Sequence, residues 1–141
     1  MITKKLVDKD GWEQIPVYGA VIAGEPTENY PIEGEYEKIS PKLASMGDMF
    51  AMRIWGDSME PEMHEGDVII VRSQHDCETG DTAVVSVGGN KATVKKIDIN
   101  DKQINVIPLN DKYPNILYDK NNISEDIKIM GIVVELRKKY N

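Results

Sequence analysis

Hydrophobic and polar residues alternate along several stretches after residue 49, and this period of two is typical of β-strands. Phe50, Met52 and Ile54 alternate with their neighbours in this way and predict a half-buried strand. The continuous apolar run Val68–Val71 predicts a buried strand, and Thr82–Val87 predicts another. We therefore expect strands, rather than helices, to supply most of the core.

A hairpin is predicted where two of these runs meet. Gly88-Gly-Asn90 is a strong turn signal, and Lys91–Asp98 follows it as the partner of Thr82–Val87. Further strands are predicted at Gln103–Leu109 and Ile127–Leu136, and short helices only around Pro41–Gly47 and Pro61–His64. Gly and Asp interrupt the pattern about every ten residues. The sequence thus predicts a mostly-β fold, a single compact domain of folded or barrel-like antiparallel sheets.

The first forty residues have a different character. Met1–Trp12 is polar with alternating charge and predicts a linker or arm. The apolar patch Ala20–Pro26 ends in Gly24 and Pro26, and residues 25–38 are rich in Glu, Pro and Gly, which predicts an extended surface segment. We therefore divide the chain into an arm (1–12), an extended segment (13–40) and a core (41–141) that forms one domain with that segment.

Charge and cysteine content narrow the classes of function. The 141 residues carry a net charge of −7, which argues against binding nucleic acid by this chain alone, because that affinity comes from Lys and Arg neutralising phosphates. A single cysteine, Cys77, excludes an internal disulfide framework and favours a cytoplasmic protein. We expect no metal, no cofactor and no membrane contact, since His and Cys are scarce and no apolar run approaches the ~20 residues of a membrane span.

Ser58 is the most informative candidate for chemistry. It lies in Gly56-Asp-Ser-Met59, directly after a predicted strand, where a hydroxyl can be exposed and backbone N–H groups can converge. Acyl transfer requires such a nucleophile and such an oxyanion hole. A serine that caps the following turn is the simpler interpretation of the same residues.

A serine nucleophile needs a base, and lysine is the best candidate. His64 and His75 lie in acidic, polar turns and are expected to be solvated. A lysine kept neutral by burial can serve, because burial disfavours the charged form. Lys95 and Lys96 lie on opposite faces of one predicted strand, and alternation does not say which of them is buried.

Three motifs in this order resemble the self-cleaving LexA, phage-repressor and UmuD family of Ser–Lys peptidases. They are Gly56-Asp-Ser-Met59, Gly66-Asp-Val-Ile-Ile-Val71 and Thr93-Val-Lys-Lys-Ile97, and the resemblance spans residues 15–136. It implies that Ser58 is the nucleophile, that Lys95 is the general base, and that the N–H groups of Asp57 and Ser58 form the oxyanion hole. It also implies a fold like the C-terminal domain of LexA.

The same resemblance implies a substrate within the chain. The family cleaves its own Ala-Gly or Cys-Gly bond in an apolar segment, and Val21-Ile-Ala-Gly-Glu-Pro26 offers the bond between Ala23 and Gly24. A homodimer is expected both from the family and from Ile127–Leu136, which is more apolar than an exposed terminal strand. Activated RecA filament on single-stranded DNA is the expected stimulus, as in the DNA-damage (SOS) response.

The expected protein is therefore the C-terminal regulatory domain of a LexA-like or prophage repressor. Its polar start resembles an interdomain linker, and contact with operator DNA is expected only through a helix-turn-helix domain that is absent from this chain. A UmuD-like subunit of an error-prone polymerase would share the same self-cleavage. A signal-peptidase-like protease and a non-enzymatic dimerisation module are the further alternatives.

Overall fold

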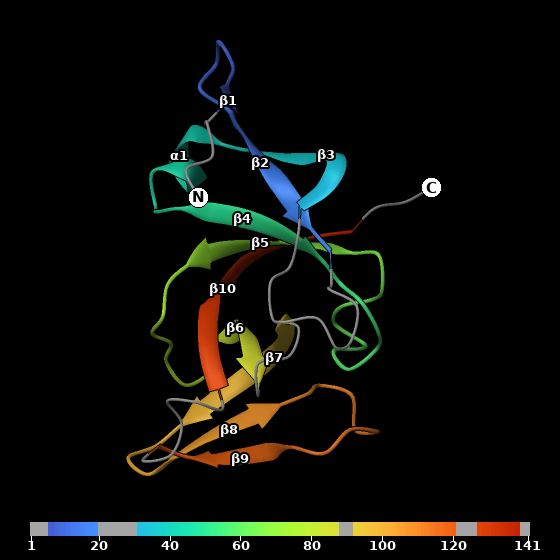
Figure 1. Ribbon diagram of the computed structural model, residues 1–141, viewed down its shortest axis with the longest axis vertical. Helices are drawn as coiled ribbons and strands as arrows, with labels where there is room; N and C mark the ends of the chain where they lie inside the picture. The colour runs from blue at the N-terminus through green and yellow to red at the C-terminus, as the bar shows by residue number, and fades with distance from the viewer. Residues whose placement is uncertain (1–5, 20–30, 88–91, 121–126, 139–141) are drawn as a thin grey trace.

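Ten strands and one short helix make up the computed structural model, which describes residues 6–19, 31–87, 92–120 and 127–138 (Figure 1). The strands are β1 (Leu6–Val7), β2 (Glu13–Tyr18), β3 (Pro31–Ile39), β4 (Met49–Arg53), β5 (Val68–Ser73), β6 (Thr82–Val87), β7 (Ala92–Ile99), β8 (Gln103–Ile107), β9 (Ile116–Asp119) and β10 (Ile127–Arg137). The helix α1 (Pro41–Ala44) is capped by the preceding residue, Ser40, whose hydroxyl accepts from the Leu43 N–H.

All strands belong to one folded sheet with the order β1-β2-β4-β5-β10-β6-β7-β8-β9, and β3 adds to β2. Neighbouring strands are antiparallel, except that β2 and β4 run parallel, with Val17 opposite Ala51 and Tyr18 opposite Met52. The path does not return to its start, so the sheet does not close into a barrel. The predicted mostly-β, single compact domain is confirmed.

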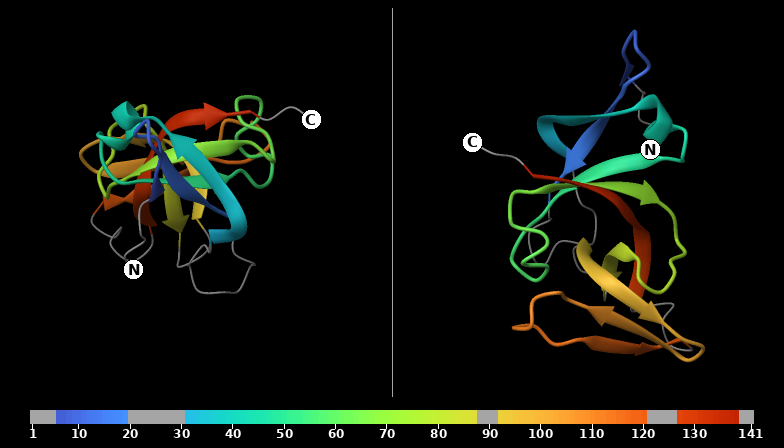
Figure 2. Two further views of the ribbon diagram at one scale, coloured as in Figure 1. Left: turned by 90° about the horizontal axis from the view of Figure 1, so that it is seen from above. Right: turned by 180° about the vertical axis from the view of Figure 1, so that it is seen from behind.

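Strand β10 joins the two ends of the molecule. One half of it pairs with β5 and the other half with β6, with register shifts at Ile129/Gly131 and Val133/Glu135. Figure 2 shows β2, β3 and β4 towards one end and β7, β8 and β9 towards the other, with β10 running between them. A Cβ on Gly131 would lie 2.5 Å from the Arg72 carbonyl oxygen, so the bend of β10 against β5 requires a glycine.

The position of β10 corrects one sequence-based argument. Its apolar residues were expected to lie on an exposed terminal strand and so to require a second copy of the chain. They lie instead in the middle of the sheet, where Ile127 and Ile132 are buried. The other apolar residues of β10 are partly buried against the three core clusters, so their hydrophobicity does not require a second copy of the chain, and the homodimer stays a prediction from the family resemblance.

The other predicted elements are largely confirmed. Strands form at each predicted run, β6 and β7 pair as a hairpin, and α1 lies within the predicted helix 41–47. The helix predicted around Pro61–His64 is instead a turn. Within the described residues 57–63 only two backbone hydrogen bonds form, from the Glu60 N–H to the Asp57 carbonyl oxygen (3.2 Å) and from the Met63 N–H to the Met59 carbonyl oxygen (3.0 Å), and a helix requires such bonds at successive residues. Leu6–Val7, within the predicted arm, pair with β2.

In the described part of the chain, buried apolar side chains form three clusters along the folded sheet. The cluster nearest Ser58 contains Met52, Ile54, Met59, Met63, Ile69, Val71, Val84, Ala92 and Val94. It joins β4, β5, β6 and β7 to the loop after β4. That loop therefore rests on a packed core, which fixes its position relative to β7.

Candidate active site

The loop that carries Ser58 is closed at its base by backbone hydrogen bonds. The Ile54 N–H donates to the Asp67 carbonyl oxygen (2.8 Å), and the Gly66 N–H donates to the Ile54 carbonyl oxygen (3.0 Å). The buried Asp67 carboxylate accepts from the His64 N–H at 2.9 Å. The Gly-Asp pair before β5 thus closes the loop, which gives a physical reason for that part of the motif.

Ser58 follows a sharp change of direction after β4. Gly56 has φ of +81°, a conformation that glycine adopts without strain, and its N–H donates to the Glu65 carboxylate at 3.1 Å. The Met59 side chain, directly after Ser58, is buried in the core beneath the loop. These two anchors leave Ser58 between them, partly exposed at the edge of a hollow.

Lys95 reaches Ser58 from β7. Its Nζ lies 2.9 Å from the Ser58 hydroxyl oxygen and also donates to the Thr93 hydroxyl (2.7 Å) and to the Val94 carbonyl oxygen (3.1 Å). Thr93 lies two residues away on the same strand, so it shares a face with Lys95. The amine is therefore held by oxygen atoms on three sides and directed at the serine.

Burial lowers the pKa of Lys95 from its ordinary value of 10.5 to about 8. Among the residues that the structure describes, no carboxylate lies within ion-pair distance of its Nζ to keep it ionised. A lysine with a pKa of about 8 is neutral in about one molecule in ten at pH 7. Ser58 and Lys95 thus form a hydroxyl–amine pair that can transfer a proton near neutral pH.

The structure also distinguishes between Lys95 and Lys96, a choice that strand alternation alone left open. Lys95 pairs with Ala83 of β6, and its side chain meets Ser58. Lys96 pairs with Thr82 and Ile107 and projects to the opposite face of β7, with no contact to Ser58. The two histidines, His64 and His75, are exposed, and neither contacts Ser58 in the described part of the chain.

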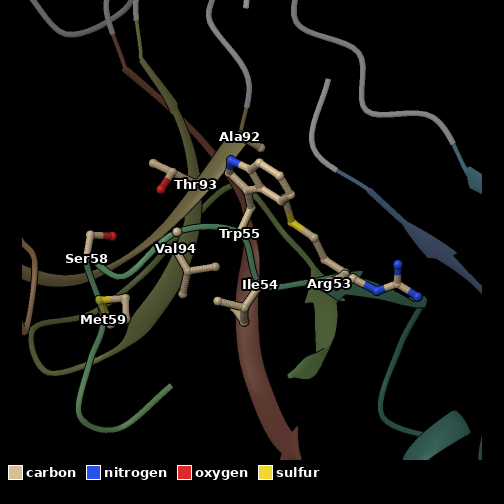
Figure 3. A pocket seen from close by; sticks show the side chains of 10 residues that line it. Arg53, Ile54, Trp55, Ser58, Met59, Ala92, Thr93 and Val94 are labelled. Carbon is tan, nitrogen blue, oxygen red and sulfur yellow. The ribbon is translucent and has the colours of Figure 1, made fainter. Parts of the chain in front are cut away.

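An apolar hollow lies beside Ser58 (Figure 3). Its walls include Met52, Ile54, Met59, Ala92 and Val94, and Trp55, labelled in Figure 3, also lines it. Trp55 is 68% exposed, which is unusual for so large an apolar side chain. A hollow of this lining suits a small apolar side chain next to the serine hydroxyl.

A second loop holds the backbone around Ser58, and the sequence gave no indication of it. Asn110, after β8, donates from its side-chain amide to the Asp57 carbonyl oxygen (2.9 Å) and from its backbone N–H to the Ser58 carbonyl oxygen (3.0 Å). Lys112 and Tyr113 donate to the Asp57 carboxylate. The Tyr113 hydrogen bond, and then that of Lys112, hold the pKa of the Asp57 carboxyl below its usual value.

The remaining sequence-based expectations concern the cleavage site, Cys77, metal ions and membrane spans. Ala23 and Gly24, the expected cleavage site, lie outside the described residues. Burial, together with Asp81 and Asp76, raises the pKa of the Cys77 thiol, which suits a packing role. Within the described ranges there is no group of His, Cys, Asp and Glu able to hold a metal ion, and no helix long and apolar enough to span a membrane.

Comparison with known proteins shows which family this chain belongs to. The peptidase S24-like family model matches residues 16–134. The LexA repressor of Carboxydothermus hydrogenoformans is 40% identical over 129 residues, which are 89% of this chain and 60% of that protein. The LexA repressor of Syntrophobacter fumaroxidans is 37% identical over 131 residues, 92% of this chain and 61% of that protein. The chain thus spans about three fifths of these relatives, and it belongs to the peptidase S24-like family.

Proposed function

We propose that this chain is the self-cleaving regulatory and dimerisation domain of a LexA-like repressor. In this proposal, Ser58 and Lys95 hydrolyse the bond between Ala23 and Gly24 of the chain itself. The observation that carries the proposal is the 2.9 Å contact between Lys95 Nζ and the Ser58 hydroxyl, made by an amine whose pKa is about 8. A surface lysine near a capping serine would have neither property.

The reaction proceeds by acyl transfer. Neutral Lys95 takes the proton of the Ser58 hydroxyl as its oxygen attacks the carbonyl carbon of Ala23. The oxyanion that forms accepts hydrogen bonds from the N–H groups of Asp57 and Ser58. The lysine ammonium then gives its proton to the departing nitrogen of Gly24. In the second step Lys95 takes a proton from water as the water oxygen attacks the acyl carbon, and it returns that proton to the Ser58 oxygen as the ester bond breaks and the Ala23 carboxyl group is released.

Thr93 and the Val94 carbonyl oxygen have a part in this cycle. Both accept hydrogen bonds from Lys95, at 2.7 Å and 3.1 Å. A charged donor makes stronger hydrogen bonds than a neutral one, so both acceptors stabilise the ammonium that forms when Lys95 takes the proton. They also keep Nζ directed at Ser58 while it is neutral.

Chain connectivity supports cleavage in cis. Tyr18, at the end of β2, pairs with Met52 of β4, and Met52 lines the hollow beside Ser58. Ala23 is five residues beyond Tyr18, so the chain can carry it up to ~17 Å from that point. The small side chain of Ala23 suits the apolar hollow, and Gly24 allows close approach to Ser58.

The wider role rests on the family relationship. We propose that activated RecA filament stimulates cleavage, that cleavage separates this domain from a helix-turn-helix domain and lifts repression, and that the chain acts as a cytoplasmic homodimer. The names of the relatives, LexA repressors, support a repressor over a polymerase subunit. The acidic net charge of −7 is consistent with DNA binding by another domain.

Intact-mass measurement tests the proposed cleavage. The purified chain, incubated between pH 7 and pH 9.5, is expected to give two fragments, residues 1–23 and 24–141, whose summed mass equals the intact mass plus one water. The Ser58→Ala chain, incubated in parallel, is expected to stay whole. A cut at a different bond, or processing of the Ser58→Ala chain, contradicts the proposal.

A further inference from the structure

Asn110 holds two consecutive carbonyl groups on either side of the nucleophile. Its side-chain Nδ2 donates to the Asp57 carbonyl oxygen (2.9 Å), and its backbone N–H donates to the Ser58 carbonyl oxygen (3.0 Å). Asn110 and Asp57 are 53 positions apart in the sequence, so their contact forms only in the folded chain. One residue of a distant loop thus fixes the orientation of both peptide groups.

The Asn110 side chain is itself held in place. Its Oδ1 accepts from the Lys112 N–H at 3.1 Å, and its carbonyl oxygen accepts from the Tyr113 N–H at 3.1 Å. With Oδ1 facing a donor, Nδ2 must be the atom that faces the Asp57 carbonyl oxygen. Lys112 and Tyr113 return to the Asp57 carboxylate, which ties this loop to the serine loop at a second point.

The orientation of the peptide between Asp57 and Ser58 has a direct chemical consequence. The carbonyl of Asp57 and the N–H of Ser58 belong to one planar trans unit and point in opposite directions. A hydrogen bond from Asn110 to the carbonyl oxygen therefore sets the direction of the Ser58 N–H on the other side. The same bond polarises the amide and makes that N–H a stronger donor, by ~10–30%.

We propose that Asn110 is a positioning residue for the reaction, which aligns and polarises the Ser58 N–H for the oxyanion. This inference rests on the proposed self-cleavage and deepens it. Asn110 does not touch the reacting atoms, and it acts through the peptide group that bears the donor. Loss of an oxyanion donor in other enzymes lowers the rate by ~100–1,000-fold, and misalignment of a donor that is still present should cost less.

The test compares first-order cleavage rates of the full chain from pH 7 to pH 9.5 for the wild type, Asn110→Ala and Asn115→Ala. Asn115 is an exposed asparagine of the same loop, outside the contacts with Asp57 and Ser58, and serves as the matched control. We expect Asn110→Ala to lower the plateau rate about ten-fold or more. The pH midpoint should stay in place, because Lys95 keeps its surroundings, and Asn115→Ala should match the wild type.

Two further comparisons make the outcome decisive. Unfolding curves of both variants in the Ser58→Ala chain show whether the loop change unfolds the protein. If Asn110→Ala does not fold, Asn110→Asp, which keeps the size and the Oδ1 acceptor but loses the donor, takes its place.

A plateau within about two-fold of the wild type, or a loss that appears only as a shifted pH midpoint, overturns the role of Asn110. A wild-type chain that stays intact at every pH overturns the proposed function itself.

Discussion

The pH dependence of the proposed self-cleavage follows most directly from the contact between Ser58 and Lys95. Only the neutral amine can take the serine proton, so the rate should follow the neutral fraction of Lys95. With a pKa of about 8, that fraction is about 9% at pH 7, about 50% at pH 8 and about 91% at pH 9. The rate should therefore rise about ten-fold from pH 7 to pH 9 and then level off.

Burial gives this profile its diagnostic shape. A lysine with the ordinary pKa of 10.5 would be about 300-fold less often neutral at pH 7, and its rate would still be rising about ten-fold per pH unit at pH 9. A plateau above pH 9 is thus the mark of a buried base. Removal of the Lys95 amine, or its replacement by a guanidinium group that stays protonated, should abolish cleavage and with it the dependence of the rate on pH.

The assay is the first-order loss of intact chain, measured by mass at each pH. Lys95→Ala and Lys95→Arg are both expected to be inactive at every pH, since Ala has no base and the guanidinium of Arg stays charged. Lys96→Ala, a change on the opposite face of β7, is the matched control and should keep the wild-type profile. A rate that is flat from pH 7 to pH 9.5, or a Lys95→Ala chain that still cleaves, refutes the lysine-base mechanism.

Three other expectations concern stability and assembly. In the Ser58→Ala chain, which stays intact, Gly131→Ala should lower the free energy of unfolding by about 1–3 kcal/mol, because its Cβ would meet the Arg72 carbonyl oxygen at 2.5 Å; an unchanged urea midpoint would contradict this. In the same background, Lys95→Met should stabilise the fold at pH 7, where Lys95 is buried with its charge. The pKa of Lys95 is about 8 in the folded chain and 10.5 in the unfolded chain, so between these pH values the unfolded chain binds more protons. The chain with Lys95 therefore gains stability as the pH rises from 8 to 10.5, and the stability advantage of Lys95→Met should shrink over that range. An advantage that does not change with pH contradicts the burial of the charge. Sedimentation at tens of micromolar should give a dimer, as proposed from the family, and a monomer at that concentration would count against it.

The strands were predictable from the sequence where an apolar or alternating run is bounded by turn residues. The apolar run Thr82–Val87 and the segment Lys91–Asp98 lie on either side of Gly88-Gly-Asn90, and β6 and β7 pair as that arrangement predicts. Strand β9, at Ile116–Asp119, was missed because it is short and its Ile116 and Leu117 are exposed, so no alternation marks it. Its existence depends on pairing with β8, which is a tertiary contact.

The candidate site was predictable only in part. The pattern Gly56-Asp-Ser-Met59 after a predicted strand made Ser58 a candidate, but a capping serine explains the same pattern, and the family resemblance was needed to choose between them. Alternation showed that Lys95 and Lys96 lie on opposite faces of their strand. Which of these faces packs against Ser58 depends on the order of the strands in the sheet. Asn110 was invisible to the sequence, since an asparagine in a polar turn looks the same whether it caps its own loop or holds a distant one.

Direct titration of Lys95 tests the central claim most closely, namely that burial makes this amine the base for Ser58. The side-chain carbon resonance next to Nζ can be followed by NMR in the Ser58→Ala chain with labelled lysine, and assigned by its loss in Lys95→Arg. Lys95 stays buried in the Ser58→Ala chain, and burial is what lowers its pKa, so a midpoint of about 8 is expected. A midpoint near 10.5, the ordinary value for lysine, would contradict the account.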